Sequence, residues 1–133
     1  MKERQWVELR DALAAHARIL AAEGGASGIR DTGLLQSALA RPRQLHAYGD
    51  KPDITTMAAA YTFDAVKNHP FVDGNRRTGF VLGIFSLVIN GYDFFASEES
   101  AAHMVLSLAA GTIDEDGFAA WLRENSKRRP RKK

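Results

Sequence analysis

The stretch Phe80-Val-Leu-Gly-Ile-Phe-Ser-Leu-Val-Ile89 decides how this chain folds. Its apolar side chains fall on almost every side of a helix, and a helix that is apolar all round is usually buried at the centre of a protein. We expect this helix to begin near Asn75 and to end at Asn90-Gly91, a pair that suits a left-handed helix stop. The apolar run is far shorter than the roughly 20 residues needed to span a bilayer.

Helical periodicity continues on the N-terminal side of this segment. A first helix ends at Gly24-Gly25 and carries an apolar stripe made of Trp6, Leu9, Leu13, Ala17 and Leu20. A second, shorter helix is capped by Asp31 and stopped by Pro42, and residues 43–53 then favour a loop. A third helix opens at Thr55 or Thr56. It should end near Asn68, because the residue before Pro70 is disfavoured in the α region.

Two further helices follow the apolar segment. Ser97 caps one that ends at Gly111, and the last covers about residues 114–125. No stretch alternates between apolar and polar residues as a strand does, and there is no repeat or internal linker. The pattern predicts an all-α fold, a helical bundle around the buried helix at about residues 75–90.

Composition limits the class of protein. The chain has 133 residues, of which 45% are hydrophobic and 26% charged, as in a globular protein with one core. It has no cysteine, which excludes disulfides and thiolate metal sites. The N-terminus has no apolar segment like that of a signal peptide. We therefore expect one domain over residues 1–126, soluble and cytoplasmic, with no membrane partner.

The positive charge of the chain is concentrated at its C-terminal end. Residues 127–133, Lys-Arg-Arg-Pro-Arg-Lys-Lys, carry six of the 18 basic side chains and no acid, so the other residues have a net charge of −4. Six clustered positive charges could contact nucleic acid weakly through phosphates. We favour a solvated, disordered tail, because the sequence shows no other basic face.

The polar loop before the apolar segment reads His69-Pro-Phe-Val-Asp-Gly-Asn-Arg-Arg-Thr78. A loop that enters the N-terminus of a helix offers free N–H groups and the positive end of the helix dipole, which together suit an anion. Arg76 and Arg77 lie in the first turn, where a cation opposes the dipole, and such a conflict marks a candidate for function. A phosphate group would satisfy the helix end and both arginines.

Other side chains of the loop also suit phosphate chemistry. Asp73 could hold Mg²⁺, which prefers one or two carboxylates together with phosphate oxygens and water. His69 could act as a base that takes a proton from an attacking hydroxyl. Gly74 allows close approach of a ligand, and Asn75 could donate to a phosphoryl oxygen while it caps the helix.

Each of these residues has a structural alternative. A single histidine at a helix end more often caps the helix, and Asp73-Gly74 is a common turn. Two arginines usually form a solvated face, and Phe71 more often fills the core than binds a ligand. On spacing alone the functional and the structural interpretations are about equal.

As a string, residues 69–78 closely resemble the signature of the Fic/Doc superfamily, and specifically its Doc (death-on-curing) toxin branch. Upstream, Gly28-Ile-Arg-Asp-Thr-Gly-Leu-Leu-Gln-Ser-Ala-Leu-Ala-Arg-Pro42 resembles a block of that branch. Asn90-Gly91-Tyr92 and Ser97-Glu-Glu match as well, so the resemblance covers roughly residues 6–124. It implies an all-α Fic-type core whose histidine deprotonates a target hydroxyl for transfer of part of a nucleotide.

The loop departs at two positions from the Fic adenylyltransferase pattern His-x-Phe-x-(Asp/Glu)-Gly-Asn-Gly-Arg-x-x-Arg. Arg76 replaces the second glycine, where its side chain would crowd the nucleotide phosphates, and Phe80 replaces the final arginine and cannot hold the terminal phosphate. The Doc branch carries Lys or Arg at the first position and is known as a kinase branch with a reversed nucleotide. The resemblance therefore implies a toxin that transfers the ATP γ-phosphate to a threonine of elongation factor Tu and arrests translation.

The same resemblance implies a role for each residue of the loop. His69 is the base, Asp73 the Mg²⁺ carboxylate, and Phe71 the residue that anchors the loop in the core. The ATP phosphates are held by Gly74, Asn75, Arg76 and Arg77. The pair Arg30-Asp31 also matches the family, and we expect it to cap a helix rather than to contact the site.

Many Fic proteins carry an inhibitory helix that reads (Ser/Thr)-x-x-x-Glu-(Gly/Asn). The nearest string here, Ile19-Leu-Ala-Ala-Glu23-Gly24, lacks the hydroxyl residue, and we interpret it as coincidence. The resemblance then implies restraint in trans by a Phd-type antitoxin whose C-terminal segment folds into a groove. Two alternatives stay open: transfer of AMP to a protein hydroxyl, and a non-catalytic binding module.

Overall fold

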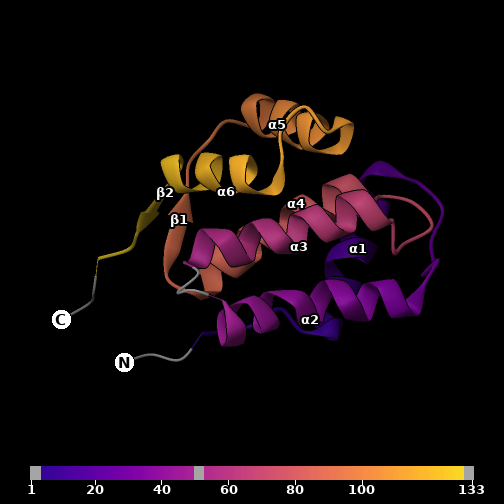
Figure 1. Cartoon of the computed structure of the whole chain (residues 1–133). Coiled ribbons are helices and arrows are strands. Elements are labelled where there is room, and N and C mark those ends of the chain that lie inside the picture. The colour runs from indigo at the N-terminus through magenta and orange to yellow at the C-terminus, as the bar shows by residue number, and fades with distance from the viewer. Residues whose placement is uncertain (1–3, 50–52, 131–133) are drawn as a thin grey trace.

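The computed structural model describes residues 4–49 and 53–130, which form six helices and two short strands (Figure 1). The helices are α1 (Leu9–Glu23), α2 (Thr32–Tyr48), α3 (Ile54–Asn68), α4 (Asn75–Ile89), α5 (Glu98–Ala110) and α6 (Glu115–Glu124). The all-α prediction is confirmed. No helix in the described ranges is long and apolar enough to cross a membrane.

The most buried helix is α3, because it packs against α2, α4, α5 and α6. Figure 1 shows α3 and α4 side by side, with α5 and α6 on one side of them and α1 and α2 on the other. Small residues let the two central helices approach: a Cβ on Gly79 would lie 2.9 Å from the Cβ of Ala65. The expected buried helix at about residues 75–90 is α4, which packs on α3 and α1, but Val88 on its outer face is exposed.

Helix α2 continues through Pro42, which was expected to stop it. Proline removes one hydrogen bond of the helix ladder. However, the Pro42 ring is fully buried, and its packing offsets that loss. Residues 43–48 are therefore helical rather than a loop. Asp50 and Pro52, on which the loop prediction also depended, lie outside the described residues.

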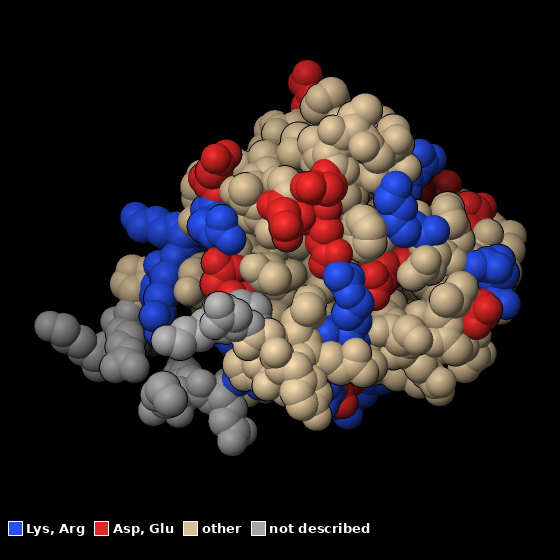
Figure 2. All heavy atoms as spheres, viewed as in Figure 1, with Lys and Arg blue, Asp and Glu red and all other residues tan. Residues whose placement is uncertain are grey.

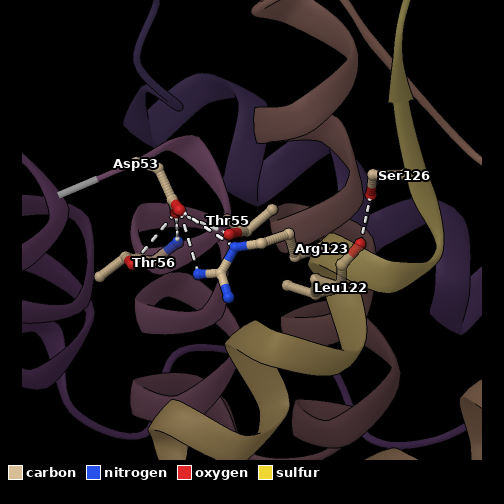
Figure 3. Close-up of polar contacts among 6 residues, drawn as sticks. All are labelled: Asp53, Thr55, Thr56, Leu122, Arg123 and Ser126. Atoms are coloured by element: carbon tan, nitrogen blue, oxygen red, sulfur yellow. Dashed lines mark hydrogen bonds and ion pairs between the residues drawn. The ribbon is translucent and has the colours of Figure 1, made fainter.

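Asp53, rather than Thr55 or Thr56, caps α3 (Figure 3). Its carboxylate accepts hydrogen bonds from the Thr56 N–H at 2.9 Å and the Thr55 hydroxyl at 2.6 Å, and it pairs with Arg123 of α6 at 3.0 Å. Partial burial alone would raise the pKa of Asp53, but these hydrogen bonds and the guanidinium outweigh it and hold the pKa below its usual value. Asp53 thus joins the start of α3 to the last turn of α6.

The first residues of the basic tail form a strand that is part of the fold. The strands β1 (Tyr92–Phe94) and β2 (Ser126–Arg128), which the sequence pattern did not predict, pair antiparallel. Arg129 then donates to the Val88 carbonyl at 2.7 Å and pairs with Asp93 at 2.9 Å. The prediction of a disordered tail is therefore wrong for residues 127–129, because β1 supplies backbone partners and a counter-charge. Residues 131–133 lie outside the described part of the chain.

Charge on the visible face is mixed (Figure 2). Lys and Arg side chains and Asp and Glu side chains are scattered over a largely uncharged face, and basic side chains gather at the edge where β2 lies. The visible face itself carries no broad basic patch away from that edge.

Candidate functional site

The loop between α3 and α4 starts with an unusual backbone conformation at His69. This residue closes α3 with φ 50° and ψ 61°, and no other non-glycine residue in the described ranges has a positive φ. Its N–H donates to the Ala65 carbonyl at 3.2 Å, and Pro70 disfavours the right-handed α region at the residue before it. The His69 side chain is exposed, as a base that meets an incoming hydroxyl must be.

Phe71 and Asn75 fix the loop to the interior. Phe71 is 1% exposed, and Asn75 is 7% exposed. The Asn75 amide both accepts from the Phe71 N–H and donates to the Phe71 carbonyl, each at 2.9 Å. The expectation that Asn75 caps α4 is wrong, because Gly74 is the N-cap residue and both hydrogen bonds of the Asn75 side chain go to Phe71. Asn75 can still offer its backbone N–H to a ligand.

His16 of α1 supports the same loop and was not identified from the sequence. Its ring stacks on Phe71, and its Nε2 lies 2.8 Å from the Asp73 carbonyl oxygen. A carbonyl only accepts, so Nε2 carries the proton and donates. His16 and Ala12 form the buried face of α1, whereas Leu13 of the predicted stripe is 39% exposed. The spacing of Ala12 and His16 was the available signal, but a histidine does not count as apolar in such a pattern.

Asp73 presents an exposed carboxylate at the end of the loop. One oxygen accepts from the Gly74 N–H at 2.9 Å and the other from the Ala26 N–H at 3.3 Å. Among the described residues, no three His, Cys, Asp or Glu side chains are grouped so that they could hold a metal ion. A single carboxylate suits Mg²⁺ that takes its other ligands from phosphate oxygens and water. The chain by itself does not form a complete cage for this ion.

The first turn of α4 is suited to an anion. The N–H groups of residues 75–77 make no hydrogen bond to any part of the chain that the structure describes, whereas the Thr78 N–H donates to the Gly74 carbonyl at 3.0 Å. Free N–H groups and the helix dipole attract negative charge at such an end. Arg76 and Arg77 in the same turn are exposed and add two positive charges.

Arg77 also contacts the C-terminal end of α1. Its Nη1 lies 3.1 Å from the Glu23 carboxylate, and both side chains are well exposed. Exposed ion pairs stabilise a protein by no more than about 1 kcal/mol, so a phosphate group can replace Glu23 at low cost. Glu23 belongs to the string that resembled an inhibitory helix, and the structure places it in contact with the candidate site.

Two open grooves flank the outer face of α4, on either side of Val81 and Phe85. The α1–α4 groove has a volume of about 430 Å³ and includes Ile19, Glu23 and Arg77 in its lining. The α4–α5 groove, of about 440 Å³, is almost entirely apolar. Neither groove is lined by His69 or Asp73. Both residues are exposed.

The chain is similar in sequence to known proteins. The profile of the Fic/DOC family matches residues 6–87, which include the loop and most of α4. A protein named Toxin Doc from Mycolicibacterium smegmatis is 37% identical over 103 residues, which cover 74% of this chain and 78% of the relative. A protein named Protein kinase doc from Escherichia phage P1 is 29% identical over 111 residues, which cover 84% of this chain and 87% of the relative.

Proposed function

Because the chain belongs to the Fic/Doc family, we propose that it is a Doc-like toxin, a protein kinase that transfers the γ-phosphate of ATP to a threonine of elongation factor Tu and so arrests translation. The observation that carries this proposal is the loop: exposed His69 precedes a helix end with free N–H groups and two arginines. The name of the phage relative, Protein kinase doc, supports a kinase.

In this proposal the phosphates of ATP lie at the N-terminus of α4. The N–H groups of residues 75–77 and the guanidinium groups of Arg76 and Arg77 balance the charge on the transferring phosphoryl group. Gly74 has a left-handed φ of 76°, which favours glycine, and it directly precedes these free N–H groups. Asp73 would hold Mg²⁺, which would neutralise phosphate charge when bound.

His69 then acts as the general base. The threonine oxygen forms a bond to the γ-phosphorus while the bond from that phosphorus to the β–γ bridging oxygen breaks. The hydroxyl proton goes to the His69 imidazole, and ADP leaves with the electron pair of the broken bond. An exposed imidazole lets a folded protein substrate bring its hydroxyl to the site.

Arg76 and Phe80 favour phosphoryl transfer over transfer of AMP. Arg76 projects from the first turn of α4, where a nucleotide bound for AMP transfer would run its phosphates along the backbone. Phe80 packs edge to face on Phe94, with ring centroids 5.8 Å apart, and lies partly buried against the core. It offers no positive charge to a terminal phosphate at the position where the adenylyltransferase pattern has its final arginine.

A toxin of this kind needs restraint, and we propose a Phd-type antitoxin as its partner. The α1–α4 groove supports this, because it joins apolar side chains such as Ile19 and Phe85 to the charged pair Glu23–Arg77. An amphipathic segment that folds on binding suits a surface with both features. Binding there would also bring the partner next to the phosphate site at Arg77.

The position of a radioactive label tests the type of transfer. With [γ-³²P]ATP we expect label on elongation factor Tu, and with [α-³²P]ATP none. Label that comes only from the α position would replace the kinase with a nucleotidyltransferase. The His69→Ala variant serves as the control for contaminating kinases.

A further inference from the structure

The segment that precedes α2 is hydrogen-bonded to the backbone of the loop between α3 and α4 (residues 69–74), which is the catalytic loop in the proposed function. The N–H groups of Arg30 and Asp31 both donate to the Pro70 carbonyl, at 2.8 and 3.0 Å, and the Val72 N–H donates to the Gly28 carbonyl at 3.0 Å. Residues 29 and 71 form an isolated antiparallel bridge between these hydrogen bonds. Two stretches far apart in the sequence thus hold each other like a short pair of strands.

The Arg30 side chain extends this contact to the end of α3. Its Nε donates to the His69 carbonyl and its Nη2 to the Asn68 carbonyl, both at 2.6 Å. The last carbonyls of a helix have no hydrogen-bond donor within the helix, and Arg30 donates to the carbonyls at the end of α3. Two bonds from one planar guanidinium fix direction as well as distance.

Arg30 therefore does not act as a helix cap together with Asp31, as the sequence suggested. Asp31 alone caps α2, by accepting from the Leu34 N–H at 2.9 Å. Arg30 reaches back to α3 and the loop instead. Among the described residues, no side chain other than that of Arg30 hydrogen-bonds to the backbone of His69.

His69 needs such support because of its backbone conformation. Residues other than glycine adopt the left-handed region rarely, and they keep it where the surroundings enforce it. The N–H of His69 is held by Ala65, its carbonyl by Arg30, and the next carbonyl, that of Pro70, by two N–H groups. With both sides of the residue fixed, the Cα–Cβ bond of His69 has a fixed direction relative to α4.

We propose that Arg30 is a positioning residue for the transfer reaction: its paired bonds to the carbonyls of Asn68 and His69 hold the imidazole of His69 where the reaction needs it. This inference rests on the proposed function, in which His69 is the base. Arg30 does no chemistry itself. Displacement of a reacting group by about 1 Å can lower a rate about 100-fold, so a small rotation of the His69 backbone is sufficient.

Three variants separate positioning from charge and from general stability. Arg30→Met removes both bonds and keeps a long side chain. Arg30→Lys keeps the positive charge but cannot donate two parallel bonds from a planar group, and it replaces the methionine variant if that one does not fold. Arg10→Met is the matched control, because Arg10 is an exposed arginine of α1 with no hydrogen bond or ion pair to the described residues.

Kinetics of phosphate transfer give the first test. We expect Arg30→Met to lower kcat about tenfold or more and to leave the KM for ATP within about twofold of the parent value. Arg30→Lys should recover part of the rate, and Arg10→Met should not change it. In a His69→Ala background, Arg30→Met should lower the residual rate no further, because its effect runs through His69. An equal loss with and without His69, or a loss confined to KM, would overturn the inference.

Backbone NMR tests the inference without any transfer assay. In ¹³C-labelled protein, the Cα and Cβ shifts of His69 should indicate a left-handed conformation, move in Arg30→Met, and stay in place in Arg10→Met. Unchanged shifts in Arg30→Met would overturn the positioning role even in an active kinase. A parent protein that transfers no phosphate to elongation factor Tu would instead contradict the proposed function, and the shifts would still decide whether Arg30 holds His69.

Discussion

His16 and Phe71 stack face to face, with ring centroids 3.9 Å apart and ring planes 9° from parallel. The stack joins α1 to the middle of the loop between α3 and α4, and the bond from His16 Nε2 to the Asp73 carbonyl joins α1 to its end. The loop is therefore held from α1 by His16 and from the segment before α2 by Arg30. Both supports leave the side chains of His69 and Asp73 exposed.

Loss of the His16 contacts should destabilise the fold. His16→Ala removes the stack and leaves the Asp73 carbonyl without its donor, so we expect the free energy of unfolding to fall by about 2 kcal/mol. His16→Gln keeps a donor without the ring and should lose less. Urea denaturation followed by circular dichroism measures both. An unchanged midpoint in His16→Ala would show that the stack contributes nothing to stability.

Binding of Mg²⁺ should depend on the nucleotide. Asp73 is the single carboxylate that the loop offers, so titration calorimetry should detect no tight Mg²⁺ binding to the protein alone. With ATP present, Asp73→Asn should weaken binding of the Mg²⁺–ATP complex about tenfold, the loss of about 1.4 kcal/mol. Asp93→Asn, another exposed aspartate, is the control. Tight metal binding without nucleotide would contradict this account of the site.

Removal of the Arg76 side chain should relax the choice of reaction. Arg76→Gly restores the glycine of the adenylyltransferase pattern, and we expect some label from [α-³²P]ATP on the target, with slower phosphate transfer. The double variant Arg76→Gly with Phe80→Arg tests both departures, at the cost of a partly buried charge against the core. If Arg76→Gly transfers no AMP, crowding by Arg76 is not what prevents that reaction.

Asp53 should make stability depend on acidic pH. Its pKa in the folded protein lies below the unfolded value, so the carboxylate stabilises the fold above the unfolded pKa, and this contribution is lost as the pH falls through the folded pKa. Asp53→Asn lacks this contribution. We expect the difference in melting temperature between the parent and Asp53→Asn to be largest near pH 7 and to shrink as the pH falls below about 4. A constant difference would contradict the role of the charge.

Local signals predicted most helix ends correctly. The predicted caps Asp31 and Ser97 each accept a hydrogen bond from an N–H three residues further on, as cap residues do. These contacts lie within one turn, so the sequence pattern alone contains them. The end of α3 at Asn68 follows from Pro70 in the same way.

The errors concern contacts between distant segments. Pro42 stays in α2 because its ring is buried against the rest of the fold, and β2 forms because β1 lies beside it. The residues of the loop could be identified from the sequence of residues 69–78, but the distant residues that hold the loop in place could not. His16 and Arg30 reach the loop from 57 and 39 residues away, respectively, and no local pattern predicts such pairs.

One measurement tests the central claim most directly: intact-mass and peptide mass spectrometry of elongation factor Tu after incubation with this protein, ATP and Mg²⁺, beside His69→Ala. We predict the gain of one phosphate on a threonine with the parent protein and no gain with His69→Ala, which lacks the base. The mass of one AMP, or a phosphate that appears equally with His69→Ala, would contradict the account.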